Sequence, residues 1–299
     1  MRGLLLTCSL ALIGSLSVSA GRGRPSKAKA SKPPTKSEIA ACGEAAMRGE
    51  STWAEPDWNA SPYAELDMLQ RVAEAHWPEG SKDRNGRIDP IFGSAKHNPV
   101  AVREYMRLAS DPAIGTICEV GYNWGATSLM WLEANQRARV FTFDLAERLY
   151  TNATLGYLNA KYDNRLTLVR GDSNQTIPAF TADRRGRAFS CDLVFVDGDH
   201  SIEGEFLNLK NFRELTPCAG SVYIMDDCDC ARNMLPTTVA FVRGVDLGFI
   251  EPQTGHKTNA ILRRSQKFLE KNVHHTFCTG HLHASDDVQH ACAAKNAIN

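Results

Sequence analysis

Short apolar runs alternate with helical patterns through most of this chain. The runs predict strands at residues 114–120, 139–143, 166–169, 192–196 and 221–225, with closing strands at 247–250 and 259–262. The spacing of apolar residues between them predicts helices at 126–135, 146–162, 201–215 and 237–243. Strands that alternate with helices indicate a parallel sheet covered on both faces. We therefore expect an α/β fold with a doubly wound, mostly parallel, seven-stranded Rossmann-like sheet.

The first residues follow a different pattern. A basic start, an apolar run over residues 4–16 and the small residues Val18-Ser19-Ala20 predict a signal peptide over residues 1–20. The run is too short to span a bilayer, although an uncleaved anchor is the alternative. Residues 21–37 are basic, Ser- and Pro-rich and free of acids. They predict a flexible linker, or else the second half of a plastid presequence. The expected localisation is therefore the secretory pathway or the extracellular space, with the plastid as the alternative.

The rest of the chain divides into three expected parts. Residues 38–108 read as a helical N-terminal cap, with helical spacing over residues 64–76. Residues 109–265 carry the alternating pattern, and residues 266–299 form a His- and Cys-rich tail. That tail is expected to be tethered, disulfide-linked or disordered, with transition-metal binding as the alternative. No segment after the signal is long and apolar enough to span a membrane.

The charges are balanced overall but unevenly placed. The chain has 34 Lys and Arg against 34 Asp and Glu. All seven charged residues before Glu38 are basic, so the remainder has 27 Lys and Arg against 34 Asp and Glu. A folded part with an acidic excess argues against nucleic acid as a partner.

Acidic residues follow nearly every predicted strand. The ligand crevice of an open α/β sheet lies outside the carboxyl ends of its strands. These side chains should therefore meet at one rim; they are Glu119, Asp144, Asp172, Asp197, Asp226 and Asp227.

The first loop on this rim indicates a cofactor. Gly121 and Gly125 allow a tight turn close to a ligand, but their spacing lacks the G-x-G-x-x-G pattern of pyrophosphate binders. Asp144 lies 23 residues after Gly121, where such folds place a ribose-hydroxyl acceptor. A ribose without a pyrophosphate fits S-adenosylmethionine. Glu119 would then hold the ammonium of its amino-acid tail, and Asp172 with Ser173 would flank the adenine.

The later rim residues indicate a cation. Asp197, Asp226 and Asp227 would repel one another unless a cation or protons neutralised them. Carboxylate oxygens suit magnesium, manganese or calcium rather than zinc, with Mg²⁺ the expected ion. The alternative is that these acids only cap the helices that follow, as Asp199 could cap the helix at Ser201.

These motifs resemble a known family. The stretch 117–227 resembles class I S-adenosylmethionine-dependent methyltransferases, and F-V-D-G-D-H-S-I-E-G over residues 195–204 is similar to the metal-dependent macrocin-type sugar O-methyltransferases. Ile202 stands where that family usually has Tyr. The resemblance implies that Asp197, Asp226 and Asp227 bind the cation and that Asp199 is the general base. His200 is assigned to the same catalytic site, as support for the ligands or as a substrate contact.

Eight of the nine cysteines remain after signal removal. Cys118 and Cys191 lie in predicted strands and read as small core residues. Cys228 and Cys230 stand beside the expected metal site, where they read as structural or as disulfide partners of Cys218, Cys278 or Cys292.

The sequence therefore predicts an S-adenosylmethionine-dependent, cation-assisted O-methyltransferase. Its acceptor would be a hydroxyl of a sugar or another small natural product. One rival is a binding protein with this fold and no turnover, and a second is a nicotinamide-dependent oxidoreductase, which the glycine spacing disfavours. The sequence identifies neither the acceptor nor the oligomeric state.

Overall fold

A computed structural model describes residues 61–77, 99–184, 189–228, 235–252 and 277–296. All the elements below belong to one compact unit, Ser31–Asn299. The signal peptide and the basic segment expected before residue 38 lie outside the described residues. Within those residues, no helix has the length and apolar character needed to cross a membrane.

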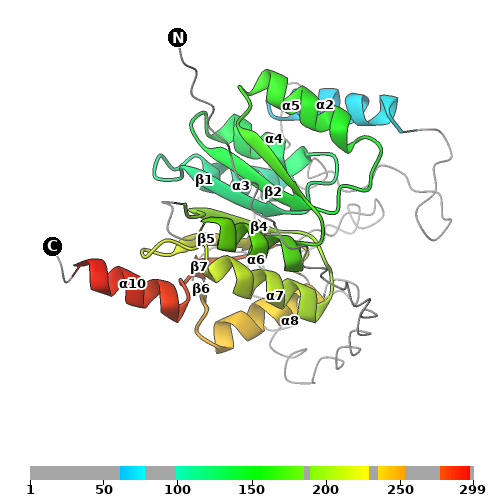
Figure 1. Ribbon diagram of the computed structural model, residues 1–299. Coiled ribbons are helices and arrows are strands. Elements are labelled where there is room, and N and C mark those ends of the chain that lie inside the picture. The colour runs from blue at the N-terminus through cyan, green and yellow to red at the C-terminus, as the bar shows by residue number, and fades with distance from the viewer. Residues whose placement is uncertain (1–60, 78–98, 185–188, 229–234, 253–276, 297–299) are drawn as a thin grey trace, which may run out of the picture. The chain divides into compact units, whose positions relative to one another are not determined.

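Seven strands form one sheet in the order β3-β2-β1-β4-β5-β7-β6 (Figure 1). The first five strands run parallel to one another, and β7 is antiparallel to both of its neighbours. This confirms the expected α/β class and the mostly parallel, seven-stranded sheet. Their bounds are β1 (Thr116–Val120), β2 (Arg139–Asp144), β3 (Leu166–Arg170), β4 (Leu193–Val196), β5 (Ser221–Met225), β6 (Ile250–Pro252) and β7 (Cys278–Leu282).

Helices cover both faces of the sheet. The helices on one face share an apolar cluster with Ile117 and Phe195; they are α2 (Tyr63–Ala75), α3 (Pro99–Ala109), α4 (Ala126–Ala134) and α5 (Thr151–Lys161). Those on the other face pack on Val120 and Val196; they are α6 (Ser173–Arg184), α7 (Ile202–Arg213) and α8 (Leu235–Asp246). All four residues of β4 are buried, as a strand covered on both sides requires.

The register of the parallel strands brings their carboxyl ends together. Val120 pairs with Phe143 on one side and with Val196 on the other, and Val196 pairs with Met225. The residues that follow these four therefore lie at one edge of the sheet. This edge, called the rim below, carries the loops after β1, β2, β4 and β5.

The structure differs from the sequence expectations toward the C-terminus. Strand β7 lies inside the segment expected to be a tail, so the sheet extends past the boundary expected at residue 265. The strand expected at 259–262 lies outside the described residues. Helices α6 and α10 (Asp286–Asn296) were not predicted, and α6 contains Pro178, a residue that normally argues against a helix interior.

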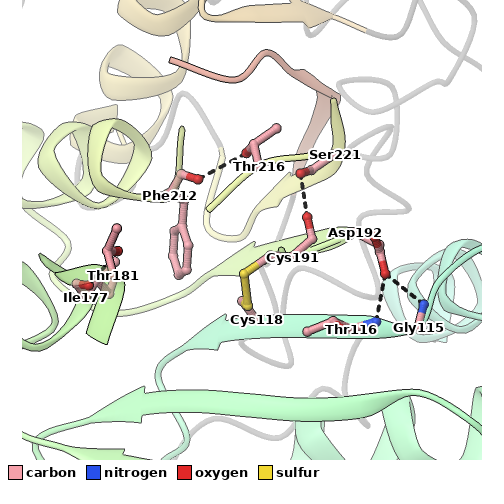
Figure 2. The surroundings of a disulfide bond; sticks show 10 residues. All are labelled: Gly115, Thr116, Cys118, Ile177, Thr181, Cys191, Asp192, Phe212, Thr216 and Ser221. Atoms are coloured by element: carbon pink, nitrogen blue, oxygen red, sulfur yellow. Dashed lines mark hydrogen bonds between the residues drawn. A yellow bond between two sulfur atoms is a disulfide. The ribbon is translucent and has the colours of Figure 1, made fainter. Parts of the chain in front are cut away.

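Cys118 and Cys191 are core residues, as expected, but the sequence did not predict their bond. Both are fully buried, but they form a disulfide that joins β1 to the residue pair preceding β4 (Figure 2). Nearby hydrogen bonds connect these strands to each other and to β5. Asp192 accepts hydrogen bonds from the backbone of Gly115 and Thr116, and Ser221 donates to the Cys191 carbonyl.

A second disulfide joins Cys228 to Cys278. This pairing is one of the three that the sequence left open for Cys228. It ties the loop after β5 to the start of β7. Cys218 is disulfide-bonded as well.

Removal of the buried disulfide should destabilise the fold. We expect the double variant Cys118→Ala/Cys191→Ala to lose about 2–5 kcal/mol of unfolding free energy, because the bond closes a long loop of the unfolded chain. Guanidinium unfolding under non-reducing conditions measures the loss. Wild-type protein that is reduced in denaturant before refolding serves as the control. An unchanged unfolding free energy in the double variant would contradict the structural role.

Candidate functional site

The loop between β1 and α4 passes directly against the backbone of the β4 loop. Gly121 has a φ of 94°, and a Cβ added to it would lie 1.8 Å from the carbonyl oxygen of Asp197. Gly125 has a φ of 86° and precedes α4 as its N-cap. Only glycine fits the first position, because the second loop occupies the space of a side chain.

Asp144 supports this loop from the end of β2. Its Oδ2 accepts hydrogen bonds from the backbone amides of Tyr122 at 2.8 Å and Asn123 at 3.1 Å. The carboxylate therefore fixes the glycine loop. Tyr150 also donates a hydrogen bond to the side-chain oxygen of Asn123. The residue expected to receive a ribose is thus adjacent to the loop, as its sequence spacing suggested.

Glu119 lies beneath the loop with no exposed surface. Ser128 donates to its Oε2, and the Trp131 ring nitrogen donates to its Oε1 at 3.3 Å. Burial raises the pKa of Glu119 to about 7, opposed by the hydrogen bonds it receives. A side chain without exposed surface does not reach a ligand directly, so this structure offers no direct contact for the ammonium group expected there.

Asp172 and Ser173 stand at the start of α6. The Asp172 carboxylate accepts a hydrogen bond from the Asn174 amide at 2.9 Å and from the Gln175 side chain at 3.2 Å. Asp172 is exposed, whereas Ser173 is buried. The observed role of Asp172 is therefore that of a helix cap at the rim.

Three side chains converge after β4 and β5. Asp197, His200 and Asp227 each offer a ligand atom, and these atoms lie within 4.8 Å of one another. His200 stands between the two carboxylates, with Nδ1 3.4 Å from Asp227 and Nε2 4.0 Å from Asp197. We call these three residues the rim cluster.

Asp226, the third expected cation ligand, makes a contact of its own. It is not part of the rim cluster, and its Oδ1 accepts a hydrogen bond of 2.9 Å from the Tyr105 hydroxyl. The structure thus brings Asp197 and Asp227 together with His200, which the sequence analysis assigned to the same site. Burial, followed by the charges of Asp226 and Asp227, raises the pKa of Asp197 well above its usual range.

Asp199 is exposed at the beginning of α7. Ser201 caps this helix by accepting from the Gly204 amide at 3.0 Å, so Asp199 is not the cap. The Asp199 carboxylate lies over Gly204, where a Cβ would be 1.9 Å from its Oδ2. Behind it, burial and the charge of Asp199 raise the pKa of Glu205 to about 8.

Sequence reasoning missed four residues that support the site. Trp131 and Ser128 bind Glu119, Tyr105 binds Asp226, and Glu205 is buried behind Asp199. The spacing of Trp131 and Ser128 from Glu119 is short enough to suggest such contacts. Tyr105 lies 121 residues before its partner, and nothing in the local sequence signals the contact.

The crossing of the two loops can be tested with one glycine. Gly121→Ala should lower the free energy of unfolding by at least about 2 kcal/mol, because the methyl group meets the Asp197 carbonyl in a strained backbone conformation. Gly156→Ala is the matched control, since no atom lies within 4 Å of a Cβ in this helix. It should raise stability by up to about 1 kcal/mol. Equal effects of the two changes in urea unfolding would argue against the crossing.

The raised pKa of Glu119 makes stability depend on pH. Between about pH 4.5 and 7 the folded chain binds more protons at Glu119 than the unfolded chain, so its contribution to stability falls as pH rises through this window. The full fall is about 3 kcal/mol. Glu119→Gln removes this pH dependence. The free energy of unfolding of the variant, measured in urea, should therefore rise relative to that of the wild type between pH 5 and pH 8. A constant difference across that range would refute the assignment.

Comparisons with known proteins agree with this geometry. A family model described as a methyltransferase domain matches residues 118–228. None of the curated proteins matches the chain in sequence. Among solved structures, cofactor-bound Rv0187 from MTB is 14% identical with a TM-score of 0.53, covering 79% of this chain and all of that one.

Two further structures are similar at lower scores. The O-methyltransferase from Bacillus cereus in complex with SAH is 13% identical, with a TM-score of 0.49, over 73% of this chain and 90% of that one. The O-methyltransferase TomG from Streptomyces achromogenes, in complex with SAM, is 18% identical with a TM-score of 0.44 over the same shares. The family match starts within β1 and ends just after β5, over the strands that carry both loops. Residues 118–228 of this chain therefore match a methyltransferase domain, and the sheet that they form has the fold seen in the cofactor-bound structure.

Proposed function

We propose that this protein transfers the methyl group of S-adenosylmethionine to a hydroxyl of a sugar or another small natural product, with the help of a divalent cation. One observation carries the proposal. The Gly121 backbone and the Asp197 carbonyl lie against each other, so the cofactor loop and the rim cluster form one continuous surface. A methyl donor on the loop would lie beside an acceptor on the cluster, and such positioning supplies most of the rate gain in group transfer.

The cofactor side of the site is formed by backbone groups and two acids. The loop ends at the N-terminus of α4, where amide groups and the helix dipole favour a carboxylate such as that of the methionine tail. Asp144 and Asp172 lie at the ends of the next two strands, where ribose and adenine would follow in order. Glu119 acts from below, because it holds α4 through Ser128 and Trp131.

The rim cluster has the donors that a divalent cation needs. The two carboxylates suit magnesium or manganese, whereas the imidazole is a ligand more typical of transition metals. A cation would offset the repulsion that, after burial, raises the pKa of Asp197. Asp197, Asp227 and His200 would hold the ion, and Asp226, whose charge acts on Asp197, would join them as a further ligand. When bound, the ion would lower the pKa of an acceptor hydroxyl and orient it.

Asp199 would accept the proton of that hydroxyl. It is exposed, two residues after Asp197, and held against Gly204 at the first turn of α7. The acceptor oxygen would form its bond to the methyl carbon as the bond from that carbon to sulfur breaks. The proton would pass to Asp199, and S-adenosylhomocysteine would leave.

We also propose that the chain folds in an oxidising compartment. Two disulfides among the described residues, Cys118–Cys191 and Cys228–Cys278, support this view. The predicted signal peptide is consistent with secretion.

Methyl transfer can be tested directly. Full-length protein with labelled S-adenosylmethionine should methylate a hydroxyl-rich metabolite extract in the presence of Mg²⁺, and EDTA should abolish the transfer. Asp199→Asn should lower turnover at least about 100-fold while cofactor affinity stays unchanged, because it removes only the base. Asp183→Asn, on an exposed part of α6, is the control and should be fully active.

The alternative functions predict other results. Cofactor binding without transfer to any acceptor would favour a silent binding protein with this fold. Binding of NAD in place of S-adenosylmethionine in calorimetry would favour an oxidoreductase. Full activity of the Asp199 variant would remove its role as base.

A further inference from the structure

Tyr105 connects a helix outside the family match to the acidic end of β5. We propose that Tyr105 is a positioning residue whose hydroxyl holds Asp226 in the orientation in which the rim binds a divalent cation. This inference rests on the cation-assisted function proposed above. It adds to the site a residue that comes from α3, before the matched residues 118–228.

The contact itself is well defined. The Tyr105 hydroxyl donates to Oδ1 of Asp226 at 2.9 Å, and only 1% of the tyrosine surface is exposed. Burial and the neighbouring charge of Asp226 raise the pKa of Tyr105 well above its ordinary value, so the phenol keeps its proton. A hydrogen bond to a charged group is worth more than a neutral one and restrains the rotation of the carboxylate.

The tyrosine ring is fixed by aromatic packing. It contacts Phe277 with ring centroids 4.9 Å apart, Phe195 at 5.3 Å and Trp131 at 5.7 Å. Phe195 belongs to β4 and lies two residues before Asp197, while Phe277 directly precedes β7. The hydroxyl therefore projects from a packed aromatic cluster, and one member of that cluster, Phe195, belongs to the strand that leads to Asp197.

The same cluster reaches the cofactor side of the rim. Trp131 packs against Phe195 at 5.5 Å and donates from its ring nitrogen to Glu119. Two side chains of one aromatic cluster thus donate hydrogen bonds to two carboxylates. Trp131 binds the buried Glu119 beneath the cofactor loop, and Tyr105 binds the half-buried Asp226 beside the rim cluster. Tyr105 donates its hydrogen bond to the second carboxylate, so its effect on the cation can be measured separately from cofactor binding.

The geometry gives Tyr105 a specific consequence for the cation. Asp226, Asp197 and Asp227 are like charges at close range, so an unrestrained Asp226 would turn away from its neighbours. The hydrogen bond opposes this rotation before any ion arrives. Loss of such an outer contact usually weakens metal binding about 10- to 100-fold.

The test measures Mn²⁺ binding to the full chain, with the EPR signal of free Mn²⁺ and calorimetry as the two readouts. Tyr105→Phe should bind Mn²⁺ about 10- to 100-fold more weakly than the wild type, with an unchanged Kd for S-adenosylmethionine. The matched control is Tyr162→Phe. Tyr162 is also buried and also donates to a carboxylate, that of Glu133, but it lies at the end of α5. Its Mn²⁺ affinity should equal that of the wild type.

A double-mutant cycle shows whether Tyr105 acts through Asp226. The loss of Mn²⁺ affinity caused by Y105F should be much smaller in a D226N background than in the wild type. Independent, additive losses would overturn the proposal. So would wild-type Mn²⁺ affinity in a folded Tyr105→Phe protein.

A measurement on the unchanged protein covers the case in which the variant fails to fold. With ¹³C at the ring carbon that carries the hydroxyl of all seven tyrosines, saturation with Mg²⁺ should shift the resonance of a buried tyrosine. No shift would overturn the positioning role. If the wild type binds neither Mn²⁺ nor Mg²⁺, cation assistance fails together with this inference, whereas normal wild-type binding with an unaffected variant removes the inference alone.

Discussion

The carbonyl oxygen of Asp197 occupies the space that a side chain at position 121 would need, and the whole rim depends on this close approach. Strands β1 and β4 are neighbours in register, so the loops that follow them leave the sheet side by side. A residue with a Cβ at position 121 would force them apart. Because the backbone can approach so closely, the loop suited to a cofactor and the acids suited to a cation share one surface rather than forming two separate sites.

This arrangement concentrates negative charge where the sheet can least solvate it. Glu119, Asp197 and Glu205 all have pKa values raised by burial, and each lies within or directly behind the rim. Such groups destabilise the ionised fold at neutral pH. Hydrogen bonds from Ser128 and Trp131 offset part of this cost at Glu119. A positively charged ligand would reduce the remaining cost of ionising these buried carboxyl groups when it binds.

The parts of this fold that sequence could predict are those set by local pattern. Continuous apolar runs that end in an acid located β1 to β5 and hence the rim. Strand β7 has few apolar residues and pairs with strands distant in sequence, so its pattern resembled a polar tail. Cys118 and Cys191 sit in apolar surroundings that suit free thiols equally well, and only the register brings them together. Asp227 has a left-handed backbone with a φ of 55°, and Asp226 is bound by a tyrosine 121 residues away. Neither is visible in the local sequence.

The Cys118–Cys191 bond closes a covalent ring at the point where the strand order reverses. Between its two ends lie α4, β2, α5, β3 and α6, which is the half of the sheet that carries Asp144 and Asp172. The backbone in this half can therefore be cut once without releasing either piece, because the sulfurs still hold β1 beside β4. Proteolytic damage to this half would leave a nicked but undivided molecule, and only reduction of a bond with no exposed surface would separate the fragments.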